Sequence, residues 1–515
     1  MSLFNARLLD IASARARLTP NRTAVVDYSR GSRREFTFLD MDVMAARVGR
    51  SLAGLGARRG SMVAVIAYNS AEYLAVYLAA AKVGHVLVPL NWRLPPGELS
   101  FVIRDSSPEI IVYQEDFRDL LEDSLDSLGY HDRPRPTLVE LGELVEGESN
   151  AGKLDPPSLT MEDPVMILYT GGTTGTPKGA IISHRQAIWN AINTIVSWGL
   201  TPNDVAPIFF PFFHTGGWHV LTIPLYTVGG RLVLVPRFSP DKALEVIERE
   251  SCTIVIGVPT MFYDMAKTAK FKEAGFESVR FFKSGGGMTP ENIVSLYTRK
   301  GKPFYQGYGL TEAGPNLLYT PPETLREAPA SVGKASMFAE LRIVKEDGRD
   351  AGPGEVGELW VRGPIVFSGY LNREKETRET LSEDGWVKTG DLFVKDEKGY
   401  YYFVERKKFM IKTGGENVYP SEVEKALRSL EGVEEAAVFG VPDEKWGEAV
   451  AALVKPKKGY TLDPDKLRRE ARKLIAGYKV PKYLWIVDHI PRTPVGKIDY
   501  QGIRRKYSAL IKGKA

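Results

Sequence analysis

A glycine- and threonine-rich segment with one lysine is the strongest chemical signal in the chain. It reads Tyr169-Thr170-Gly171-Gly172-Thr173-Thr174-Gly175-Thr176-Pro177-Lys178-Gly179 and precedes a helical pattern that begins near Ser183. Glycines let backbone N–H groups face an anion, hydroxyls add donors or Mg²⁺ ligands, and the lysine supplies a positive charge. Because Pro177 precedes Lys178 and Gly179 follows it, the segment is not a Walker A loop. We interpret it as a polyphosphate-binding loop.

Further motifs follow in order along almost the whole chain. They are Pro211-Phe212-Phe213-His214, Ser284-Gly285-Gly286-Gly287, Gln306-Gly307-Tyr308-Gly309-Leu310-Thr311-Glu312, Gly357-Glu358-Leu359, Thr389-Gly390-Asp391, Arg406–Asn417 and Pro491-Arg492-Thr493-Pro494-Val495-Gly496-Lys497. Together with the loop they closely resemble the signatures of the adenylate-forming superfamily, which contains acyl-CoA synthetases, firefly luciferase and amino-acid adenylation domains. The resemblance implies an ATP-dependent acid:CoA ligase. Such an enzyme forms an acyl-adenylate with release of pyrophosphate, then an acyl-CoA thioester with release of AMP.

The resemblance assigns the ATP phosphates and magnesium to residues of two motifs. Thr311 would contact phosphate, and Glu312 and Thr173 would bind Mg²⁺. A carboxylate beside a triphosphate is costly unless a cation intervenes, so Glu312 makes independent sense as a metal ligand. The residues expected to hold the β- and γ-phosphates are Thr170, Gly171, Gly172, Thr173, Thr174, Gly175, Thr176 and Lys178.

The nucleoside end of ATP is assigned in the same way. Tyr308 has an aromatic face suited to stack on adenine, and Gln306 has an amide suited to bond the edge of the base. Asp391 resembles the family's ribose-binding acid, and Arg406 would support the ribose or phosphate region. The glycines expected to line this nucleotide site are Gly285, Gly286, Gly287, Gly307 and Gly309.

The C-terminal motifs predict a mobile domain. By resemblance, Lys497 is the catalytic lysine that meets the reacting carboxylate and α-phosphate, and Lys408 is the hinge. Rotation at the hinge would replace Lys497 with a face that binds coenzyme A. The residues expected on that face are Lys412, Gly414, Gly415 and Trp446. Phe409 stands where the family usually has Asp, and Tyr500 where a basic residue is frequent.

The identity of the acid is less determined by the sequence. His214 replaces the aspartate with which amino-acid-adenylating relatives bind the substrate ammonium, and it would line the carboxylate end of the pocket. Phe213-His214-Thr215-Gly216-Gly217-Trp218 resembles fatty acyl-CoA synthetases, in which a tryptophan at the Trp218 position gates the acyl tunnel. Gly217 and Gly287 leave room for a sizeable acyl group. A medium- or long-chain fatty acid is therefore the leading hypothesis.

Three other functions stay open on the sequence alone. They are an aryl or short-chain acid:CoA ligase, an adenylating module that feeds a carrier protein, and a luciferase-like oxygenase. A binding protein with degenerate motifs is disfavoured because Lys178, Glu312, Asp391 and Lys497 are all present.

Composition limits the class of protein. A net charge of +4 over 515 residues gives no argument for a nucleic-acid partner. A single cysteine, Cys252, excludes an internal disulfide and fits a reducing cytoplasm, and we expect its thiol to be buried and inert. No stretch is long and apolar enough for a transmembrane helix. A cytoplasmic enzyme that acts on small molecules is expected, and the sequence leaves its oligomeric state open, with a homodimer as one alternative.

The elements that must position these motifs follow from periodicity. Short β-branched runs such as Met62–Ile66 alternate with helical patterns such as Asp241–Glu250, which is typical of a layered α/β fold with largely parallel sheets. Glycine turns and short strands over about 330–407 indicate a small β-rich subdomain. A change of pattern near Lys408 separates an N-terminal domain, 1–407, from a small α+β C-terminal domain, 408–515, which includes a helix predicted over Pro464–Ile475.

Overall fold

The chain divides into two compact units. Unit 1 comprises Met1–Leu341, Trp360–Thr389 and Gly399–Tyr401, and unit 2 comprises Arg342–Leu359, Gly390–Lys398 and Tyr402–Ala515. The computed structural model describes residues 9–129, 134–146, 158–170, 177–414, 416–444, 446–493 and 498–512. The predicted domains, 1–407 and 408–515, stay a prediction.

The largest sheet of unit 1 has the strand order β6-β5-β3-β4-β7-β8 and is parallel except for the antiparallel pair β7–β8. Its strands are β6 (Thr137–Glu140), β5 (Ile110–Tyr113), β3 (Met62–Ile66), β4 (Val86–Pro89), β7 (Pro164–Thr170) and β8 (Lys178–Ser183). The central strands are buried over most of their length because helices cover a parallel sheet on both faces.

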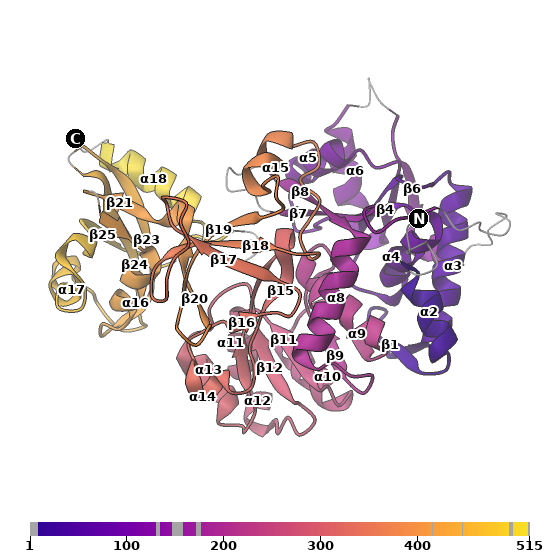
Figure 1. Cartoon of the computed structure of the whole chain (residues 1–515), viewed down its shortest axis with the longest axis horizontal. Coiled ribbons are helices and arrows are strands. Elements are labelled where there is room, and N and C mark those ends of the chain that lie inside the picture. Colours follow the sequence, from indigo (N-terminus) through magenta and orange to yellow (C-terminus); the bar gives the residue numbers. More distant parts are fainter. Residues whose placement is uncertain are drawn as a thin grey trace. The chain divides into compact units, whose positions relative to one another are not determined.

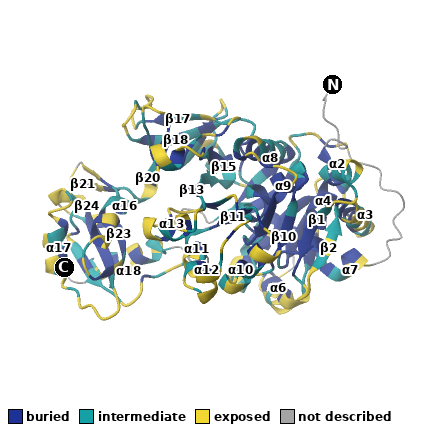
Figure 2. Ribbon diagram, turned by 90° about the horizontal axis from the view of Figure 1, so that it is seen from below, coloured by how far each residue is buried: buried dark blue, intermediate teal, exposed yellow. Residues whose placement is uncertain are grey.

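Two further sheets complete the layered body. One has the order β2 (Arg34–Thr37), β1 (Thr23–Asp27), β10 (Arg231–Leu234) and β9 (Val205–Ile208), and the other is the parallel set β11 (Ile254–Gly257), β12 (Phe281–Ser284) and β13 (Phe304–Gln306). Figure 2 shows the buried strands β1 and β10 in dark blue. The prediction of a layered α/β fold with largely parallel sheets is confirmed.

Helices of unit 1 cover these sheets. They are α2 (Ile11–Leu18), α3 (Phe38–Gly54), α4 (Ala71–Val83), α5 (Pro96–Ser106), α6 (Arg118–Asp126), α7 (Leu141–Glu146), α8 (His184–Trp198), α9 (Thr222–Val228), α10 (Pro240–Arg249), α11 (Pro259–Ala266), α12 (Ala269–Glu273), α13 (Glu291–Thr298), α14 (Thr324–Glu327) and α15 (Glu374–Thr380). Helix α8 packs on both α9 and β15 (Gly314–Tyr319), as Figure 1 shows.

Helix α4 illustrates how local sequence determines an element. Ser70 caps its N-terminus by accepting a hydrogen bond from the Tyr73 N–H, and Gly84 ends it in the left-handed conformation at φ +84°. Almost every residue between them is buried, so the helix has no polar stripe. Such a pattern is typical of a helix inside the protein, and the Ser70 cap and Gly84 stop it after 13 residues.

Short antiparallel strands follow the layered body. Strands β14 (Tyr308–Leu310), β15 and β16 (Lys334–Ala335) form one small sheet. Strands β17 (Glu340–Val344), β18 (Gly357–Arg362), β19 (Val387–Lys395) and β20 (Tyr401–Arg406) form another, along which the chain passes from unit 1 to unit 2. Strands β16 to β20 lie within about 330–407, where glycine turns predicted short strands, whereas β14 and β15 precede that range.

Unit 2 is built on a sheet with the order β22 (Glu416–Val418), β21 (Ile411–Thr413), β24 (Gly447–Pro456) and β23 (Val433–Asp443), with β25 (Tyr483–Ile486) also paired to β24. Successive side chains of β23 enter two different cores. Ala436 and Val438 pack with α16 (Pro420–Arg428) and α17 (Pro464–Ala471), whereas Ala437 and Phe439 pack with α18 (Tyr500–Lys512). This alternation is the period of two of a strand that is covered on both faces.

The observed elements differ from the predicted ones in small ways. The helix expected over Pro464–Ile475 ends at Ala471. Cys252 is buried, as expected, and burial raises the pKa of its thiol. In the part of the chain that the structure describes, no helix combines the length and apolar character needed to cross a bilayer.

A buried carboxyl in unit 2 links three elements. Glu424 Oε1, on α16, accepts a hydrogen bond from the Val438 N–H at 2.9 Å and from the Tyr500 hydroxyl at 2.7 Å. Burial raises the pKa of Glu424 to about 7; Glu405 adds to this effect and Arg428 opposes it. Near neutral pH this carboxyl therefore exchanges a proton while it holds α18 against α16.

We expect Glu424→Gln to make unit 2 more stable at pH 8. In the wild type, the folded form keeps a proton that the unfolded chain loses between pH 4.5 and about 7, so this stabilisation disappears as pH rises through about 7. The variant is neutral at every pH, and the difference from wild type should reach on the order of 1–3 kcal/mol. Urea unfolding at pH 5 and pH 8 measures it, with the exposed Glu431→Gln as control. Equal effects at the two pH values would contradict the assignment.

Candidate functional site

The hairpin that carries the phosphate loop is formed by β7 and β8. Thr170 at the end of β7 pairs in register with Lys178 at the start of β8, and the Thr170 hydroxyl lies 3.4 Å from the Lys178 carbonyl oxygen. The predicted phosphate ligands Gly171, Gly172, Thr173, Thr174, Gly175 and Thr176 lie outside the described residues. Lys178 therefore stands where the chain leaves the loop and enters the sheet.

Tyr370 brings Lys178 and Glu312 to one place. The Lys178 Nζ lies 5.4 Å from the centroid of the Tyr370 ring, and the Tyr370 hydroxyl donates to Glu312 Oε1 at 2.8 Å. The neighbouring backbone fixes this position, since the Leu371 N–H donates to the Gly179 carbonyl oxygen at 2.8 Å. Burial, followed by the Glu312 carboxylate, raises the pKa of Tyr370, so its hydroxyl stays a donor.

Sequence reasoning missed Tyr370. The residue lies 58 positions after Glu312 and belongs to none of the motifs, so only the fold reveals the contact. The one local signal is an aromatic residue directly after Gly369, in a short connection between β18 and α15. A cationic lysine, a phenol donor and a carboxylate within one cluster suit an anionic ligand with a bound cation.

Thr311 is positioned by the helix that follows β8. Ser183 caps α8 by accepting a hydrogen bond from the Gln186 N–H at 3.3 Å, but the Gln186 side chain does not bond back to Ser183. Its amide donates instead to the Thr311 carbonyl oxygen at 2.8 Å. Gln186 therefore connects the first turn of α8 to the short helix Thr311–Ala313 (η3).

The glycine motif after β12 leaves an open surface. A side chain at Gly285 would meet nothing within 4 Å, and Gly286 has φ +74°. Beside it the Gly307 N–H donates to the Ser284 carbonyl oxygen at 2.7 Å, which joins the two predicted nucleotide motifs. The next residue, Tyr308, begins β14 and is half-buried.

Two other residues of the nucleotide motif have structural contacts. The Gln306 amide is buried, and both of its ends face the main chain of Thr289, at 3.4 Å and 3.3 Å. Gly309 is required by packing, because a Cβ there would lie 2.2 Å from the Pro315 backbone. Gln306 is therefore held by its own fold before any base could approach.

The predicted acid-binding motif forms a rigid aromatic layer. Trp218 is fully buried and stacks between Phe212, at 4.1 Å, and Tyr77, at 5.1 Å between ring centroids. Its indole N–H donates to the Phe212 carbonyl oxygen. His214 is half-buried, with its ring 4.6 Å from that of Phe213. Trp218 is thus held on both faces and at its nitrogen.

The glycines of the acid motif have two different roles. A Cβ at Gly217 would lie 2.4 Å from the Pro211 carbonyl oxygen, so a close approach of the backbone requires glycine there rather than space for a ligand. At Gly287 the nearest atom to an added Cβ is 3.6 Å away, on Pro259, so that position does leave room.

In unit 2 the buried acid of the Thr389-Gly390-Asp391 motif meets Arg406. Arg406 Nε lies 3.1 Å from Asp391 Oδ1, and the Asp391 side chain is 2% exposed. Glu358, from the motif Gly357-Glu358-Leu359, contacts the residues next to both partners. One of its oxygens accepts from the Gly390 N–H at 3.0 Å, and the other pairs with Lys407 Nζ at 2.8 Å. This carboxylate holds the Gly390 turn beside the segment that leads to Lys408.

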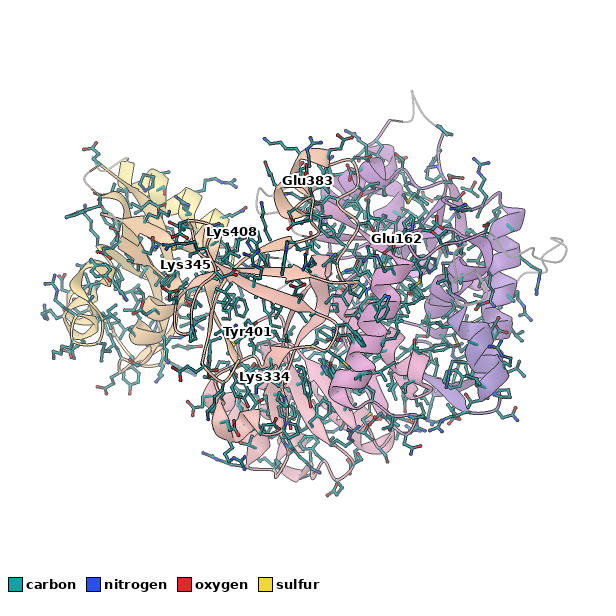
Figure 3. The ribbon with its side chains drawn as sticks, viewed as in Figure 1. Glu162, Lys334, Lys345, Glu383, Tyr401 and Lys408 are labelled. Carbon is teal, nitrogen blue, oxygen red and sulfur yellow. The ribbon has the colours of Figure 1, made fainter. Side chains whose placement is uncertain are left out.

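The predicted hinge is attached to the last helix of unit 2. Lys408, labelled in Figure 3, lies in the short helix Lys407–Phe409 (η4), and its Nζ is 4.7 Å from the Phe409 ring centroid. The Phe409 ring lies 5.0 Å from that of Tyr500. The two departures from the family pattern thus contact each other. Lys497 lies outside the described residues.

Two predicted coenzyme A residues also meet in unit 2. The Gly414 N–H donates to the Trp446 carbonyl oxygen at 2.9 Å, and a Cβ at Gly414 would lie 2.6 Å from the indole. The Trp446 side chain is 45% exposed, so it offers a face for stacking. Lys412 pairs with Glu346 at 3.0 Å. Gly415, next to Gly414, lies outside the described residues.

Two family models match the chain. One, described as AMP-binding enzyme, matches residues 12–371, and the other, described as AMP-binding enzyme C-terminal domain, matches residues 422–497. The chain belongs to the AMP-binding enzyme family. The predicted membership of the adenylate-forming superfamily is therefore confirmed.

Curated relatives of this AMP-binding enzyme are CoA ligases for different acids. It is 36% identical over 498 residues to a feruloyl-CoA synthase of Amycolatopsis sp, covering 96% of this chain and 97% of the relative. It is 35% identical over 497 residues to indoleacetate–CoA ligase of Aromatoleum aromaticum (95% and 96%) and 33% identical over 507 residues to long-chain-fatty-acid–CoA ligase FadD13 of Mycobacterium tuberculosis (96% and 98%). The predicted class, acid–thiol ligase, is confirmed.

Solved structures agree with this family. ATP-bound MatB from Rhodopseudomonas palustris has a TM-score of 0.87 at 30% identity, covering 98% of this chain and 100% of that one. O-succinylbenzoate coenzyme A synthetase (MenE) from Bacillus subtilis, in complex with ATP and magnesium, has a TM-score of 0.85 at 28% identity (96% and 98%). The expected cofactors ATP and Mg²⁺ are thus confirmed for homologous structures, and coenzyme A for relatives named CoA ligases.

We expect Tyr370→Phe to lower kcat/KM for ATP about tenfold. The change removes one hydrogen bond to a carboxylate, about 1.5 kcal/mol, and leaves the ring beside Lys178 in place. The loss should shrink as Mg²⁺ is raised, because a bound cation also orients Glu312. Steady-state kinetics at several Mg²⁺ concentrations measure this.

A matched control is Tyr28→Phe, which removes a 2.5 Å hydrogen bond to Glu250 elsewhere in unit 1. Equal losses in the two variants would indicate general destabilisation and would contradict a role for Tyr370 at the site.

Proposed function

We propose that this protein is an ATP-dependent acid:CoA ligase that forms an acyl-adenylate and then an acyl-CoA thioester. The observation that carries this assignment is the cluster in which Tyr370 joins Lys178 and Glu312, beside the strand that continues the glycine–threonine loop. In adenylation a carboxylate attacks the α-phosphorus of ATP and pyrophosphate leaves. Both reactants are anions, so charge neutralisation and alignment provide most of the rate.

Unit 1 would hold the triphosphate. We assign the β- and γ-phosphates to Lys178 and the Thr170–Thr176 segment, and a phosphate contact to Thr311. The residues fit Mg²⁺, because this ion is usually held by one or two carboxylates together with substrate phosphates, and Glu312 provides such a carboxylate. When bound, the ion would neutralise charge on the phosphates. Glu312 would be a ligand and Thr173 a second one. Among the described residues there is no cluster of three acidic, His or Cys ligands, which fits an ion shared with its substrate.

The nucleoside would be recognised by an aromatic ring, an open backbone surface and a buried acid. We assign the adenine to Tyr308 and to the open backbone surface of Gly285, Gly286 and Gly287, where an added Cβ at Gly285 meets nothing. Gln306, Gly307 and Gly309 shape that surface. Asp391, oriented by Arg406 at 3.1 Å, would accept the ribose hydroxyls.

The thioester step would use a different face of unit 2. The thiol of coenzyme A has a pKa of about 8.5, so a few per cent is thiolate at pH 7 and no dedicated base is needed. We assign the adenine of coenzyme A to the exposed face of Trp446, beside Gly414 and Gly415, with Lys412 nearby. Rotation at Lys408 would exchange this face for Lys497. Two further lysines of unit 2, Lys479 and Lys482, pair with Glu422 and Asp443 at 2.6 Å and 2.5 Å.

For the acid we propose a compact molecule with an aromatic body. His214 would lie at the carboxylate end, and Gly287 leaves room beside it. Stacking on both faces and the N–H bond hold Trp218 as a closed wall behind this motif, so a long chain could pass only if Trp218 moved. The relatives named for ferulate and indoleacetate support the same choice.

A medium- or long-chain fatty acid is the second candidate because of a cavity behind that wall. Its volume is about 300 Å³, and Tyr77, which stacks on Trp218, lies in its lining together with apolar residues of α2, α4, α8 and α9. If Trp218 and Tyr77 turned aside, the cavity would accept an alkyl chain. The homodimer and the cytoplasmic location stay predictions.

We expect Lys497→Ala to separate the two half-reactions. Adenylation, measured as ATP–pyrophosphate exchange, should fall by at least about 10², as when one donor to a developing anion is removed. Thioester formation from preformed acyl-adenylate should change little, because Lys497 would be displaced in that state. Lys506→Ala, an exposed lysine on α18, is the control. Equal damage to both steps would refute separate conformations.

An acid panel tests the function and the choice of acid. We expect AMP release that requires both coenzyme A and acid, with hydroxycinnamic and arylacetic acids turned over at least about tenfold faster than C8–C16 fatty acids. Dependence on a carrier protein instead of coenzyme A would support the adenylating module. Failure of ATP–pyrophosphate exchange with every acid would overturn the ligase.

A cavity-filling variant distinguishes the two acids further. Ile188→Trp adds bulk to the cavity lining and should leave aryl acids unaffected, whereas it should reduce turnover of long fatty acids if the cavity receives them. Val196→Trp, on the exposed face of the same helix, is the control.

A further inference from the structure

Lys283 is a fully buried lysine that none of the proposed chemistry uses. It lies on β12, directly before Ser284 and the open glycine motif, and it is 5% exposed. Its Nζ donates to the Thr320 hydroxyl at 2.8 Å and lies 4.5 Å from the Trp198 ring centroid. No acidic side chain of the described residues pairs with it. A buried charge without an opposite charge is costly, so a specific role is expected.

Further contacts connect Lys283 to Gln306 and Gly307 of the nucleotide motif. The Thr320 hydroxyl lies 3.3 Å from the Gln306 carbonyl oxygen, to which it donates. A Cβ at Gly307 would lie 2.7 Å from Lys283 Cε, so the lysine stem packs directly beneath the Gly307 backbone. Lys283 and Thr320 thus support the strand β13 where it passes into Tyr308.

We propose that Lys283 is a positioning residue for the nucleotide base: through Thr320 it fixes the backbone of Gln306 and Gly307, and with it the ring of Tyr308 and the Gly285 surface. This role rests on the proposed function, because it requires that adenine binds there. Lys283 itself touches neither substrate nor reacting atoms. It belongs to none of the motifs that identify the family.

The protonation state of the lysine determines the direction of this hydrogen-bond chain. An ammonium can only donate, so the Thr320 proton must point to the Gln306 carbonyl oxygen. A neutral amine can accept that proton, and the bond to Gln306 is then lost for part of the time. Burial lowers the pKa of Lys283 to about 7. The chain therefore switches near neutral pH.

The surroundings of Lys283 contain few groups that titrate. Helix α8 presents Trp198, and the segment after β15 presents Thr320. Strand β13 places Tyr305 opposite Lys283 in register, and burial, followed by Tyr319 and Glu323, raises the pKa of Tyr305. Neither tyrosine ionises near pH 7, so a transition at that pH belongs to Lys283 or to the ligand.

The test compares Lys283→Met and Thr320→Val with wild type and with the exposed Lys270→Met. Thr320→Val removes the hydrogen bond to the Gln306 carbonyl oxygen, and Lys283→Met removes the donor that orients the Thr320 hydroxyl toward it. KM for ATP should therefore rise about three- to tenfold while kcat changes less than twofold. In wild type the KM should rise as pH increases from 6 to 8.5, and in both variants this rise should be absent. Because ATP itself titrates in this range, the KM of each variant is divided by the KM of wild type at the same pH.

An unchanged KM, or a loss confined to kcat, would overturn the positioning role. A wild-type protein that forms no AMP with any acid would instead overturn the proposed function, so the two failures are distinguishable. If Lys283→Met does not fold, Thr320→Val alone decides, because it keeps the shape of the side chain and removes only the hydroxyl.

Stability provides a second readout that needs no activity. The folded pKa of Lys283 is below that of the unfolded chain, so between about 7 and 10.5 the unfolded chain binds the extra proton and the free energy of unfolding rises with pH. Urea unfolding at pH 7 and pH 9.5 should show this rise in wild type and a smaller one in Lys283→Met. An equal rise in the free energy of unfolding in wild type and Lys283→Met would show that Lys283 is not neutral in the folded protein at high pH.

Discussion

The hydrogen bond from Tyr370 to Glu312 is the contact on which the candidate site depends. Three segments distant in the chain meet there: the hairpin β7–β8, the turn Thr311–Ala313 and the connection that carries Tyr370. Backbone bonds fix the connection on β8, so the phenol has no freedom to leave. Glu312 and Lys178, which lie far apart in the chain, therefore both contact the same tyrosine side chain.

The aromatic layer around Trp218 imposes a second constraint. Gly217 allows the backbone to fold tightly against Pro211, and this approach directs the indole inward, where Phe212 and Tyr77 enclose it. Full burial of a side chain of this size contributes about 1.5–3 kcal/mol. The packing that stabilises unit 1 therefore also opposes movement of Trp218. In the proposed function, this opposition is what disfavours a long acyl chain.

Local sequence predicted the elements well, because periodicity and caps act over a few residues. Met62–Ile66 forms a strand with the expected bounds. The motifs also predicted residue types that the structure brings together, such as Asp391 with Arg406 and Gly414 with Trp446. The sequence did not predict contacts between residues that lie far apart along the chain. Tyr370 and Gln186 belong to no motif, and Glu358 belongs to one without an assigned role. The partners that make them important lie 58, 125 and 32 residues away, respectively.

Two buried titratable residues, Lys283 and Glu424, also support predicted motifs through contacts with distant residues. Lys283 and Glu424 lack an opposite charge among their hydrogen-bond partners, and burial brings the pKa of each to about 7, so each can be neutral near that pH. Neither belongs to a predicted motif, yet each contacts a residue in or next to one: Lys283 lies beneath Gly307, and Glu424 bonds to Tyr500, which packs on Phe409 beside the predicted hinge Lys408. For Lys283 the charged form gives the stronger support of Gln306, because an ammonium can only donate to Thr320. A buried group that titrates near pH 7 therefore links the geometry of its motif to pH, and such a group is found by its burial and not by a motif.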